Sequence, residues 1–415
     1  MNLTRRTLTK ALGAAALGSC APRELALAKT APQALPDRTQ FEASRFQTSL
    51  NNARWHPLSR GAQATIEQYL DYKRRGVWHP PDLVTAMQQH VREEFAALVH
   101  ADADEIAFVP STTAGENLLV ASLGFPSRKG NIVTDALHFE GSLYFYKALE
   151  RLGVDVRVVQ VSGWGIALDA MAAVIDANTR LVAVSQVSFV NGFQHALAPL
   201  CKLAHTYGAL VYADAVQAAG CIPVDVHASG VDAMATASYK WLMGDMGLGF
   251  LYVRKDVLPQ LHRTVYGYRQ LSRYTRHIFP WDTAGPFPVE YSADETTAGH
   301  FEIGTYANPV IAALSFSLPW LRAIGIESIQ SHAQQLIARL RREMAALGYH
   351  CLTPEASHAP IVAFRVEDSE RVAQRLGRAK VDVGLSEGIL RASPSVYNTM
   401  EDVDRLLNAL DARRG

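Results

Sequence analysis

Two residues that could cooperate in a reaction, Asp214 and Lys240, follow successive apolar runs in the middle of the chain. A lysine amine can form a Schiff base with an aldehyde, and a carboxylate can pair with a cationic ring. Each residue also has an ordinary explanation, because aspartate caps helices well and a lysine beyond a strand is usually solvated. The order of the two residues along the chain favours a catalytic role over these ordinary explanations. The acid comes first, the lysine follows one further apolar run, and Gly244, Gly247 and Gly249 then let the chain turn back.

A second set of residues could hold an anion and a flat ring. The stretch Ser111-Thr112-Thr113-Ala114-Gly115 lies between an apolar run and a helical pattern, where amides and hydroxyls suit a phosphate at a helix N-terminus. In isolation it would be a capping sequence. Phe139 follows the apolar run 131–134 and could stack on a ring or belong to the core. With Asp214 and Lys240, these residues match the needs of pyridoxal phosphate (PLP), with Lys240 as the Schiff-base lysine.

The elements that must position these side chains alternate between strands and helices over residues 62–254. Several strand candidates are apolar on both faces, which is typical of strands covered by helices on each side. The predicted strands are 106–109, 131–134, 154–161, 181–187, 209–214, 232–238 and 248–253. The predicted helices are 115–123, 141–152, 168–175 and 197–207. This pattern predicts an α/β fold with a mainly parallel central sheet flanked by helices.

The pattern changes after residues 255–300, which give no clear assignment. Helices are predicted over 326–347, 369–379 and 400–413, and strands over 359–366 and 381–392. They indicate a smaller α+β domain. The expected organisation is an N-terminal arm at 29–60, a large PLP-binding domain at 61–300 and a small C-terminal domain at 301–415. No apolar stretch beyond the first 28 residues is long enough to predict a transmembrane segment.

The first 28 residues have the features of an export signal. Arg5 and Arg6 precede the apolar run 11–19, and Ala26-Leu27-Ala28 has the small-x-small form of a cleavage site. A paired arginine before such a run is typical of the twin-arginine signal. We therefore expect a periplasmic protein that is a partner of the twin-arginine export machinery. The segment before Cys20 also passes as a weak lipoprotein box, which leaves a lipid anchor at Cys20 open.

Charge and cysteine content limit the class of partner. Forty Lys and Arg balance forty Asp and Glu, for a formal net charge of +0. A neutral balance gives no field to attract nucleic acid, whereas a small amino substrate fits it. Only Cys201, Cys221 and Cys351 follow the signal, so no disulfide framework is expected. No metal site is predicted.

With these motifs in view, the chain resembles the class V aminotransferase family of fold type I PLP enzymes, nearly throughout after residue 45. The most specific part runs from Val231-Asp232 through Ser238-Tyr239-Lys240 to Gly247-Leu248-Gly249. The resemblance implies that Ser238 and Tyr239 bind the cofactor, with Tyr239 at the phosphate as in kynureninases. It also implies that Thr112 and Thr113 bind the cofactor and that Gln217 contacts its phenolic oxygen.

Further matches imply roles outside this core. Thr305, in Phe301-Glu302-Ile303-Gly304-Thr305, is similar to the family threonine that reaches the phosphate of the neighbouring subunit. This implies a homodimer with shared active sites. Arg391 is similar to the family arginine that binds the substrate α-carboxylate, a planar anion that suits a guanidinium. Asn51 and Asn52 are expected to line the substrate pocket.

Departures from the family pattern narrow the expected activity. Cysteine desulfurases carry a nucleophilic cysteine shortly before the carboxylate arginine, but residues 381–390 contain none, so persulfide chemistry is not expected. Phe189 stands where desulfurases have an asparagine beside the ring, so the segment 187–193 resembles the kynureninase and isopenicillin N epimerase branches. Kynurenine cleavage is not expected of an exported protein.

We therefore expect an exported PLP enzyme that acts at the α-carbon or amino group of an amino acid or an amino-acid-derived metabolite. Aminotransfer or a related deamination is expected first, with Lys240 as the general base at Cα. Alternatives are an epimerase similar to isopenicillin N epimerase, a C–S or C–C lyase, and a catalytically degenerate periplasmic binding protein. The presence of Asp214, Lys240, Thr305 and Arg391 argues against the last. The signal and fold together also resemble periplasmic PLP enzymes that modify the glutamyl side chain of pyoverdine siderophores.

Overall fold

The structure is a computed structural model that describes residues 34–76, 83–283, 285, 287–386 and 388–411. The predicted export signal, including Cys20, lies outside the described residues, as does the beginning of the predicted arm. Among described helices none is by itself long and apolar enough to cross a membrane. The pair Asn308–Ile324 and Ile326–Ala346, bent by 76°, meets the length and composition criteria only when taken together.

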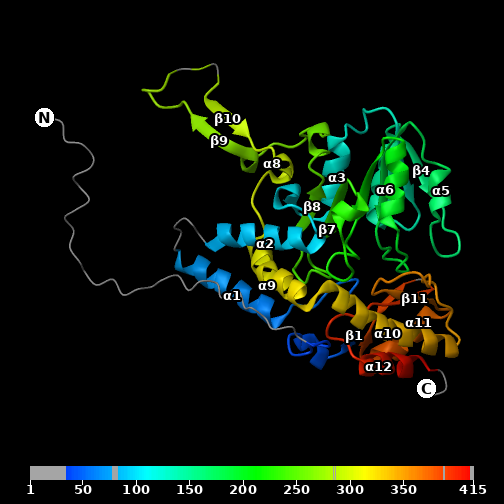
Figure 1. Cartoon of the computed structure of the whole chain (residues 1–415). Helices are drawn as coiled ribbons and strands as arrows, with labels where there is room; N and C mark the ends of the chain where they lie inside the picture. The colour runs from blue at the N-terminus through cyan, green and yellow to red at the C-terminus, as the bar shows by residue number, and fades with distance from the viewer. Residues whose placement is uncertain (1–33, 77–82, 284, 286, 387, 412–415) are drawn as a thin grey trace, which may run out of the picture. The chain divides into compact units, whose positions relative to one another are not determined.

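A seven-stranded sheet forms the centre of the structure, in the order β2-β8-β7-β6-β5-β3-β4 (Figure 1). The strands are β2 Ile106–Val109, β3 Asn131–Asp135, β4 Asp155–Val159, β5 Thr179–Ser185, β6 Leu210–Asp214, β7 Ala233–Ala237 and β8 Gly249–Val253. The pairs from β7 to β4 are parallel, and β8 runs antiparallel to both β2 and β7. All seven strands form where the sequence predicts them, to within a few residues.

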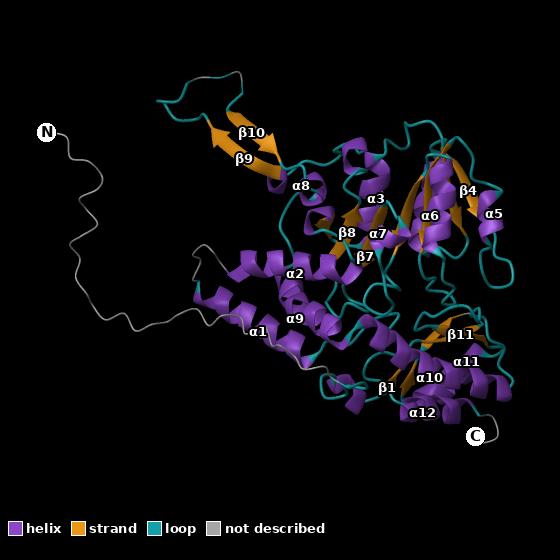
Figure 2. Ribbon diagram, viewed as in Figure 1, coloured by secondary structure: helices purple, strands orange, loops and turns teal. Residues whose placement is uncertain are grey.

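Helices connect these strands and cover the sheet (Figure 2). They are α3 Thr112–Ser122, α4 Glu140–Arg151, α5 Leu168–Ala172, α6 Leu197–Thr206 and α7 Val226–Ser229. Strands β3, β7 and β8 are buried at every position, because both faces of the sheet are covered. Gly249 begins β8 where a side chain has no room, since a Cβ there would lie 2.4 Å from the Thr236 carbonyl oxygen. The predicted α/β fold is confirmed.

Three long helices that were not among the predicted elements form a second group. They are α1 Arg60–Arg75, α2 Leu83–Val99 and α9 Asn308–Ile324. Helix α9 packs against both α1 and α2. The first long helix of the predicted small domain therefore lies against helices of the predicted large domain, and the proposed boundary at residue 300 stays a prediction.

The C-terminal region is an α+β layer, as expected. Helices α10 Ile326–Ala346, α11 Ser369–Ala379 and α12 Met400–Leu410 accompany the antiparallel sheet β11 Val362–Arg365, β14 Ile389–Ala392 and β13 Gly384–Ser386. The single strand predicted over 381–392 is broken into β12, β13 and β14, and Gly388, with a φ of +74°, lies between β13 and β14. The N-terminal arm joins this layer through β1 Thr48–Ser49, which pairs in parallel with β12 Val381–Asp382.

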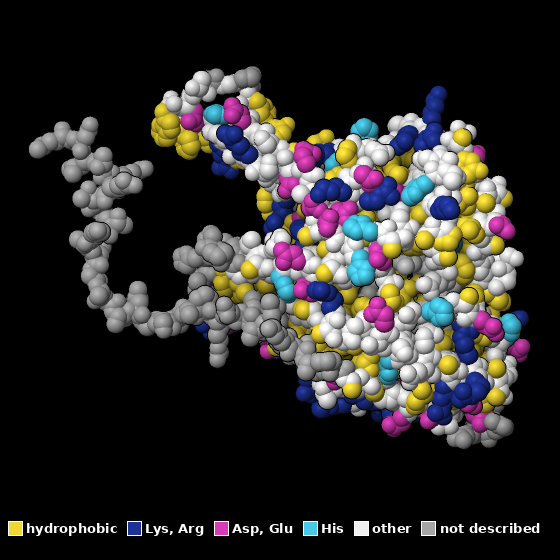
Figure 3. Space-filling view, in the orientation of Figure 1, with side chains coloured by type: hydrophobic (Ala, Val, Ile, Leu, Met, Phe, Trp, Pro, Cys, Tyr) yellow, Lys and Arg dark blue, Asp and Glu magenta, His cyan; other side chains and the backbone are white. Residues whose placement is uncertain are grey.

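Residues 255–300, which the sequence left unassigned, form a projecting hairpin and the short helix α8 Thr297–Phe301 (Figure 1). The hairpin strands are β9 Leu271–Arg276 and β10 Val289–Ala293. Neither strand has a buried residue, so neither shows the alternation that identifies a half-buried strand. Hydrophobic side chains gather on the hairpin, including Trp281, which is 78% exposed (Figure 3).

Candidate active site

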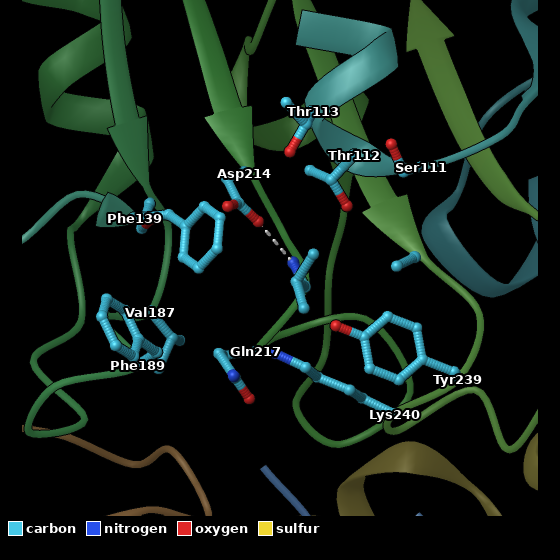
Figure 4. Close-up of a pocket in the computed structure, with 13 residues that line it drawn as sticks. Ser111, Thr112, Thr113, Phe139, Val187, Phe189, Asp214, Gln217, Tyr239 and Lys240 are labelled. Atoms are coloured by element: carbon cyan, nitrogen blue, oxygen red, sulfur yellow. Dashed lines mark hydrogen bonds between the residues drawn. The ribbon is translucent and has the colours of Figure 1, made fainter. Parts of the chain in front are cut away.

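A cavity lies at the carboxyl edge of the central sheet. Strands β2, β3, β5, β6 and β7 all end there, since β2 and β7 are each antiparallel to β8 and so run in the same direction. The cavity contains seven of the predicted site residues, Thr112, Thr113, Phe139, Asp214, Gln217, Tyr239 and Lys240 (Figure 4). It is also lined by Ser111, Ser185, Val187, Phe189, Val216 and Ala237.

Asp214 ends β6 with its carboxylate in the cavity and only 6% of the residue exposed. One carboxylate oxygen, Oδ1, accepts a hydrogen bond of 2.9 Å from the Val216 N–H. Burial raises the pKa of Asp214, while the neighbouring His138 and this N–H partly offset the effect. A cation placed in the cavity would stabilise the carboxylate, as a protonated pyridine nitrogen does.

Lys240 extends into the same cavity from the loop that follows β7 (Figure 4). Burial lowers the pKa of Lys240 to about 8, although Asp214 opposes the shift. Within the described part of the chain its Nζ has no hydrogen bond or ion pair. A lysine with this pKa is largely neutral slightly above pH 8, and only the neutral amine attacks an aldehyde.

The loop after Lys240 is held in place by Ser238. The Ser238 hydroxyl is fully buried and lies 2.6 Å from the Asp245 carbonyl oxygen and 2.7 Å from that of Leu248. Gly244 fits beneath it, because a Cβ there would lie 2.9 Å from the Ser238 Cβ. The structure therefore does not bring the Ser238 hydroxyl into the cavity, and its contacts are those of a residue that positions Lys240.

The start of α3 offers a site for a phosphate. Ser111 caps the helix by accepting from the Ala114 N–H at 3.1 Å. Thr112 Oγ1 is buried and has no hydrogen-bond partner among the described residues. A free hydroxyl at the positive end of a helix is suited to an anion. Tyr239 completes this side of the cavity, and burial raises the pKa of its phenol, which keeps the phenol a donor.

Two aromatic rings enclose the other side of the cavity. Phe139 and Phe189 meet edge to face, with ring centroids 5.5 Å apart and an interplanar angle of 73°. Their apolar surfaces can cover a flat heterocycle and exclude water from it. Asp214, Lys240 and the α3 terminus therefore fit the ring nitrogen, the aldehyde and the phosphate of PLP, with Phe139 placed to cover the ring.

Gln217 lines the cavity, but its side-chain amide already forms two hydrogen bonds to other residues. Its Nε2 donates to the Ala53 carbonyl at 2.9 Å, and its Oε1 accepts from Trp241 Nε1 at 2.8 Å. One amide N–H remains for the predicted contact with the cofactor's phenolic oxygen. Gln217 therefore links the N-terminal arm to the lysine loop as well.

Arg391 lies in β14 and is connected to the cavity through Phe189. It donates to the Phe189 carbonyl, while its Nε is buried with no acceptor among the described residues. Burial and the nearby Arg54 lower the pKa of Arg391 to about 10. Gly384 leaves space beside it, since a Cβ there would lie 3.2 Å from the Arg391 Nε. An unpaired, buried guanidinium donor is suited to a carboxylate.

Three other predicted residues lie outside the Lys240 cavity. Thr305 lines a different cavity, together with Asn117 and Gly247. Its predicted contact with a neighbouring subunit stays a prediction. Asn52 is fully buried and bonded to Ser393, Tyr397 and Asn398, at 2.9 Å, 2.8 Å and 3.2 Å.

Asn51 is also turned toward the C-terminal layer. Its Nδ2 donates to Asp382 Oδ1 at 3.1 Å, and its backbone forms a bridge with Ser393. The two asparagines thus tie the N-terminal arm to the C-terminal layer, and neither is among the residues that line the Lys240 cavity.

Ser185, Val187, Val216 and Ala237 lie in the cavity wall, although no role was predicted for them. The available signal was their position, since each lies within two residues of the end of a predicted strand. Across the described residues, no group of three or more His, Cys, Asp or Glu is arranged to hold a metal ion.

Comparison with known proteins gives one family and several distant relatives. Residues 58–406 match the family model described as Aminotransferase class-V. A probable cysteine desulfurase of Methanothermobacter thermautotrophicus is 27% identical over 384 residues, covering 86% of this chain and 92% of that protein. An uncharacterized aminotransferase of Bacillus subtilis is 27% identical over 380 residues, covering 91% of this chain and 97% of that protein.

A solved structure supports the fold. C-DES, crystallised with glycine covalently linked to its PLP cofactor, matches with a TM-score of 0.81 at 23% identity. The match covers 91% of this chain and 99% of that one.

The buried contacts of Asn52 predict a structural effect on substitution. We expect Asn52→Ala to lower the free energy of unfolding by about 2 kcal/mol, because it leaves buried partners unsatisfied. The KM for an amino acid substrate should stay unchanged. Denaturant unfolding and steady-state kinetics test this, with the exposed Asn178→Ala as control. A higher KM at unchanged stability would instead assign Asn52 to the substrate pocket.

The lowered pKa of Lys240 predicts how the apoprotein captures PLP. We expect the rate of covalent capture, followed by visible absorbance, to rise with pH and reach half its maximum near pH 8, because deprotonation of the amine is required. An unperturbed lysine would give a midpoint near about 10.4.

Lys240→Ala should form no band that borohydride removes, whereas the control Lys255→Ala, on the surface, should behave as the wild type. A reducible band that persists in Lys240→Ala would show that another amine carries the cofactor.

Proposed function

Since the chain belongs to the class-V aminotransferase family of PLP-dependent enzymes, we propose that it acts at the α-carbon or amino group of an amino acid or an amino-acid-derived metabolite. Aminotransfer or a related deamination is the first candidate reaction. The observation that carries the proposal is the unpaired Nε of Arg391 beside the Lys240 cavity, because it provides a place for the α-carboxylate.

Each residue of the proposed site has a role that follows from its side-chain chemistry. PLP, when bound, supplies an aldehyde for the substrate amine and a ring that accepts electrons. Asp214 would hold a proton on the ring nitrogen, and Thr112 with the α3 terminus would hold the phosphate. Lys240, with its pKa lowered to about 8, can take and return a proton at Cα near neutral pH. Phe139 and Phe189 would keep water from the reacting atoms.

A C–S lyase is the second candidate, because the relative from Methanothermobacter thermautotrophicus is named a probable cysteine desulfurase. The cysteines of this chain do not favour a persulfide on the enzyme. Cys201 and Cys221 are buried, and burial raises the pKa of both thiols. Cys351 is partly exposed, and none of these three cysteines lines the cavity. If the protein is a C–S lyase, it would therefore cleave the C–S bond of the substrate without transferring sulfur to an enzyme cysteine.

Product analysis separates the candidates. The purified protein, loaded with PLP, would be incubated with amino acids with and without a keto-acid acceptor, and with cysteine or cystine. A keto acid that forms only when an acceptor is present supports aminotransfer. A keto acid that forms in the absence of an acceptor, with no release of sulfide, supports deamination. Sulfide supports the lyase, and a racemised substrate alone supports the epimerase. No product from any amino compound would overturn the proposal.

A homodimer is part of the same proposal. Thr305 lines a cavity separate from that of Lys240, so within one chain it is not placed to contact the same phosphate. A second copy of the chain would give Thr305 the role that the family resemblance implies. Sedimentation of the purified protein tests the stoichiometry.

Arg391 predicts a selective loss of carboxylate recognition. We expect Arg391→Gln to raise the KM for amino acids by ~30-fold, because a charge-assisted hydrogen bond contributes about 2 kcal/mol. Amines that lack a carboxylate should be unaffected. The control is Arg365→Gln, an exposed arginine on the paired strand β11. Equal losses for amino acids and simple amines would count against the assignment.

Export by the twin-arginine route is proposed from the sequence and predicts where the protein accumulates. We expect the wild type in the periplasmic fraction of a host with this pathway. The double change Arg5→Lys and Arg6→Lys should retain it in the cytoplasm, because the pathway recognises the arginine pair. Lys10→Gln is the control. Equal periplasmic amounts of wild type and double variant would contradict the proposal.

A further inference from the structure

A buried chain of polar side chains extends from the cavity wall into the space between α3 and α4. Glu116 in α3 is 1% exposed and accepts hydrogen bonds from the hydroxyls of Ser142 and Tyr146, both in α4. His138 Nε2 lies 3.2 Å from Glu116 Oε1. His138 Nδ1 lies 2.8 Å from the hydroxyl of Ser185. None of these residues has a role in the chemistry described above.

The chain of contacts ends at the cofactor cavity. Ser185 is the last residue of β5, and its Cα is the register partner of Asp214 at the end of β6. It lines the cavity together with Asp214. Phe139, placed to cover the ring, directly follows His138 in the sequence. The buried network is therefore connected to two residues of the cavity wall, Ser185 and Phe139.

The charges around His138 favour its protonated form. Burial alone lowers the pKa of His138, but the hydrogen bond and negative charge of Glu116, with added effects of Asp214 and Asp135, raise it above the usual value. Among the described residues near His138, burial raises the pKa of the Tyr146 and Tyr212 phenols, so both stay neutral. His195 contacts Asp135, with its Nε2 3.1 Å from Asp135 Oδ2. His138 is thus a buried imidazole whose protonated form is favoured by Glu116, with smaller effects of Asp214 and Asp135.

The protonation state fixes the direction of the Ser185 hydrogen bond. Both ring nitrogens of a protonated histidine are donors, so Ser185 Oγ must accept from His138 Nδ1. The hydroxyl proton of Ser185 is then not used by His138. No other partner of this hydroxyl is found within the described chain, and the cavity is the space that it faces.

We propose that Ser185 is a further cofactor-binding residue, which donates its hydroxyl proton into the cavity, and that the buried His138–Glu116 pair positions it. His138 acts through Ser185 and through its charge near Asp214, so it is a positioning residue. The proposal rests on PLP as the cofactor and is independent of which reaction the enzyme performs.

PLP affinity is the first test. Apoprotein of the wild type, Ser185→Ala and His138→Gln would be titrated with PLP under equilibrium dialysis, and the melting temperature of each would be recorded. We expect both variants to bind PLP ~10-fold more weakly, equivalent to about 1.4 kcal/mol. The control is His205→Gln, which removes a histidine bonded at 2.8 Å to the buried Asp232 in another part of the fold. It should bind PLP as the wild type does.

Histidine NMR of the apoprotein is the second test. The resonance missing from His138→Gln identifies His138, and its titration midpoint should lie above the usual value of about 6.5. In Glu116→Gln the partner that raises the pKa is gone, so burial should bring the midpoint below that value.

Each result decides for or against the proposal. If Ser185→Ala binds PLP as tightly as the wild type, Ser185 does not contact the cofactor. A fall in melting temperature with unchanged PLP affinity would show that the network is structural only. A His138 midpoint below about 6.5 in the wild type would overturn the positioning role. Should His138→Gln fail to fold, Ser185→Ala still decides, since it removes one oxygen and leaves the buried pair intact.

Discussion

A carboxylate buried at the edge of the central sheet is the constraint on which the site depends. Asp214 is almost inaccessible, and an isolated buried charge is among the most costly features that a fold can carry. The structure offsets this cost with the Val216 N–H, the positive charge of His138 and the amine of Lys240. A cation in the cavity would stabilise the Asp214 carboxylate further, and a protonated pyridine ring is such a cation.

The topology of the sheet brings the rest of the site to that carboxylate. Because β2, β3, β5, β6 and β7 share one direction, the segments that follow them converge on one edge. The antiparallel strand β8 returns the chain after the lysine loop, so that Lys240 stays at the same edge. The helix terminus of α3, the ring of Phe139 and the hydroxyl of Ser185 then need no long loops to reach the cofactor.

The sequence predicted the sheet well because its strands are apolar on both faces and bounded by turns. The hairpin of β9 and β10 escaped prediction because it has no buried face. Within the site, Asp214 and Lys240 were identified from their order along the chain. Ser238 and Asn52 were expected in the site because of the family resemblance. Sequence does not reveal that their side chains turn toward Leu248 and Ser393.

His138 and Ser185 were not predicted to be connected, because the local sequence gives no reason to link them. Ser185 lies near the end of a strand predicted over 181–187, and Glu116 lies in a helix predicted over 115–123. Their link depends on the packing of α3 and α4 against β5, a tertiary contact that no spacing rule encodes. Buried polar groups of this kind become visible only when the partners of each are identified in three dimensions.

The charges also indicate what the complete site must contain. Lys240 and Arg391 are both partly buried cationic residues, and burial lowers the pKa of each because it disfavours the charged form. Among the described residues Asp214 is the anion that opposes this shift at Lys240, and in the proposed site it would pair with the ring nitrogen. An anion beside Arg391 would stabilise the guanidinium, and the residues suited to the cofactor phosphate lie at α3 instead. A substrate carboxylate would supply this anion, which is the physical basis for expecting amino acids rather than simple amines as substrates.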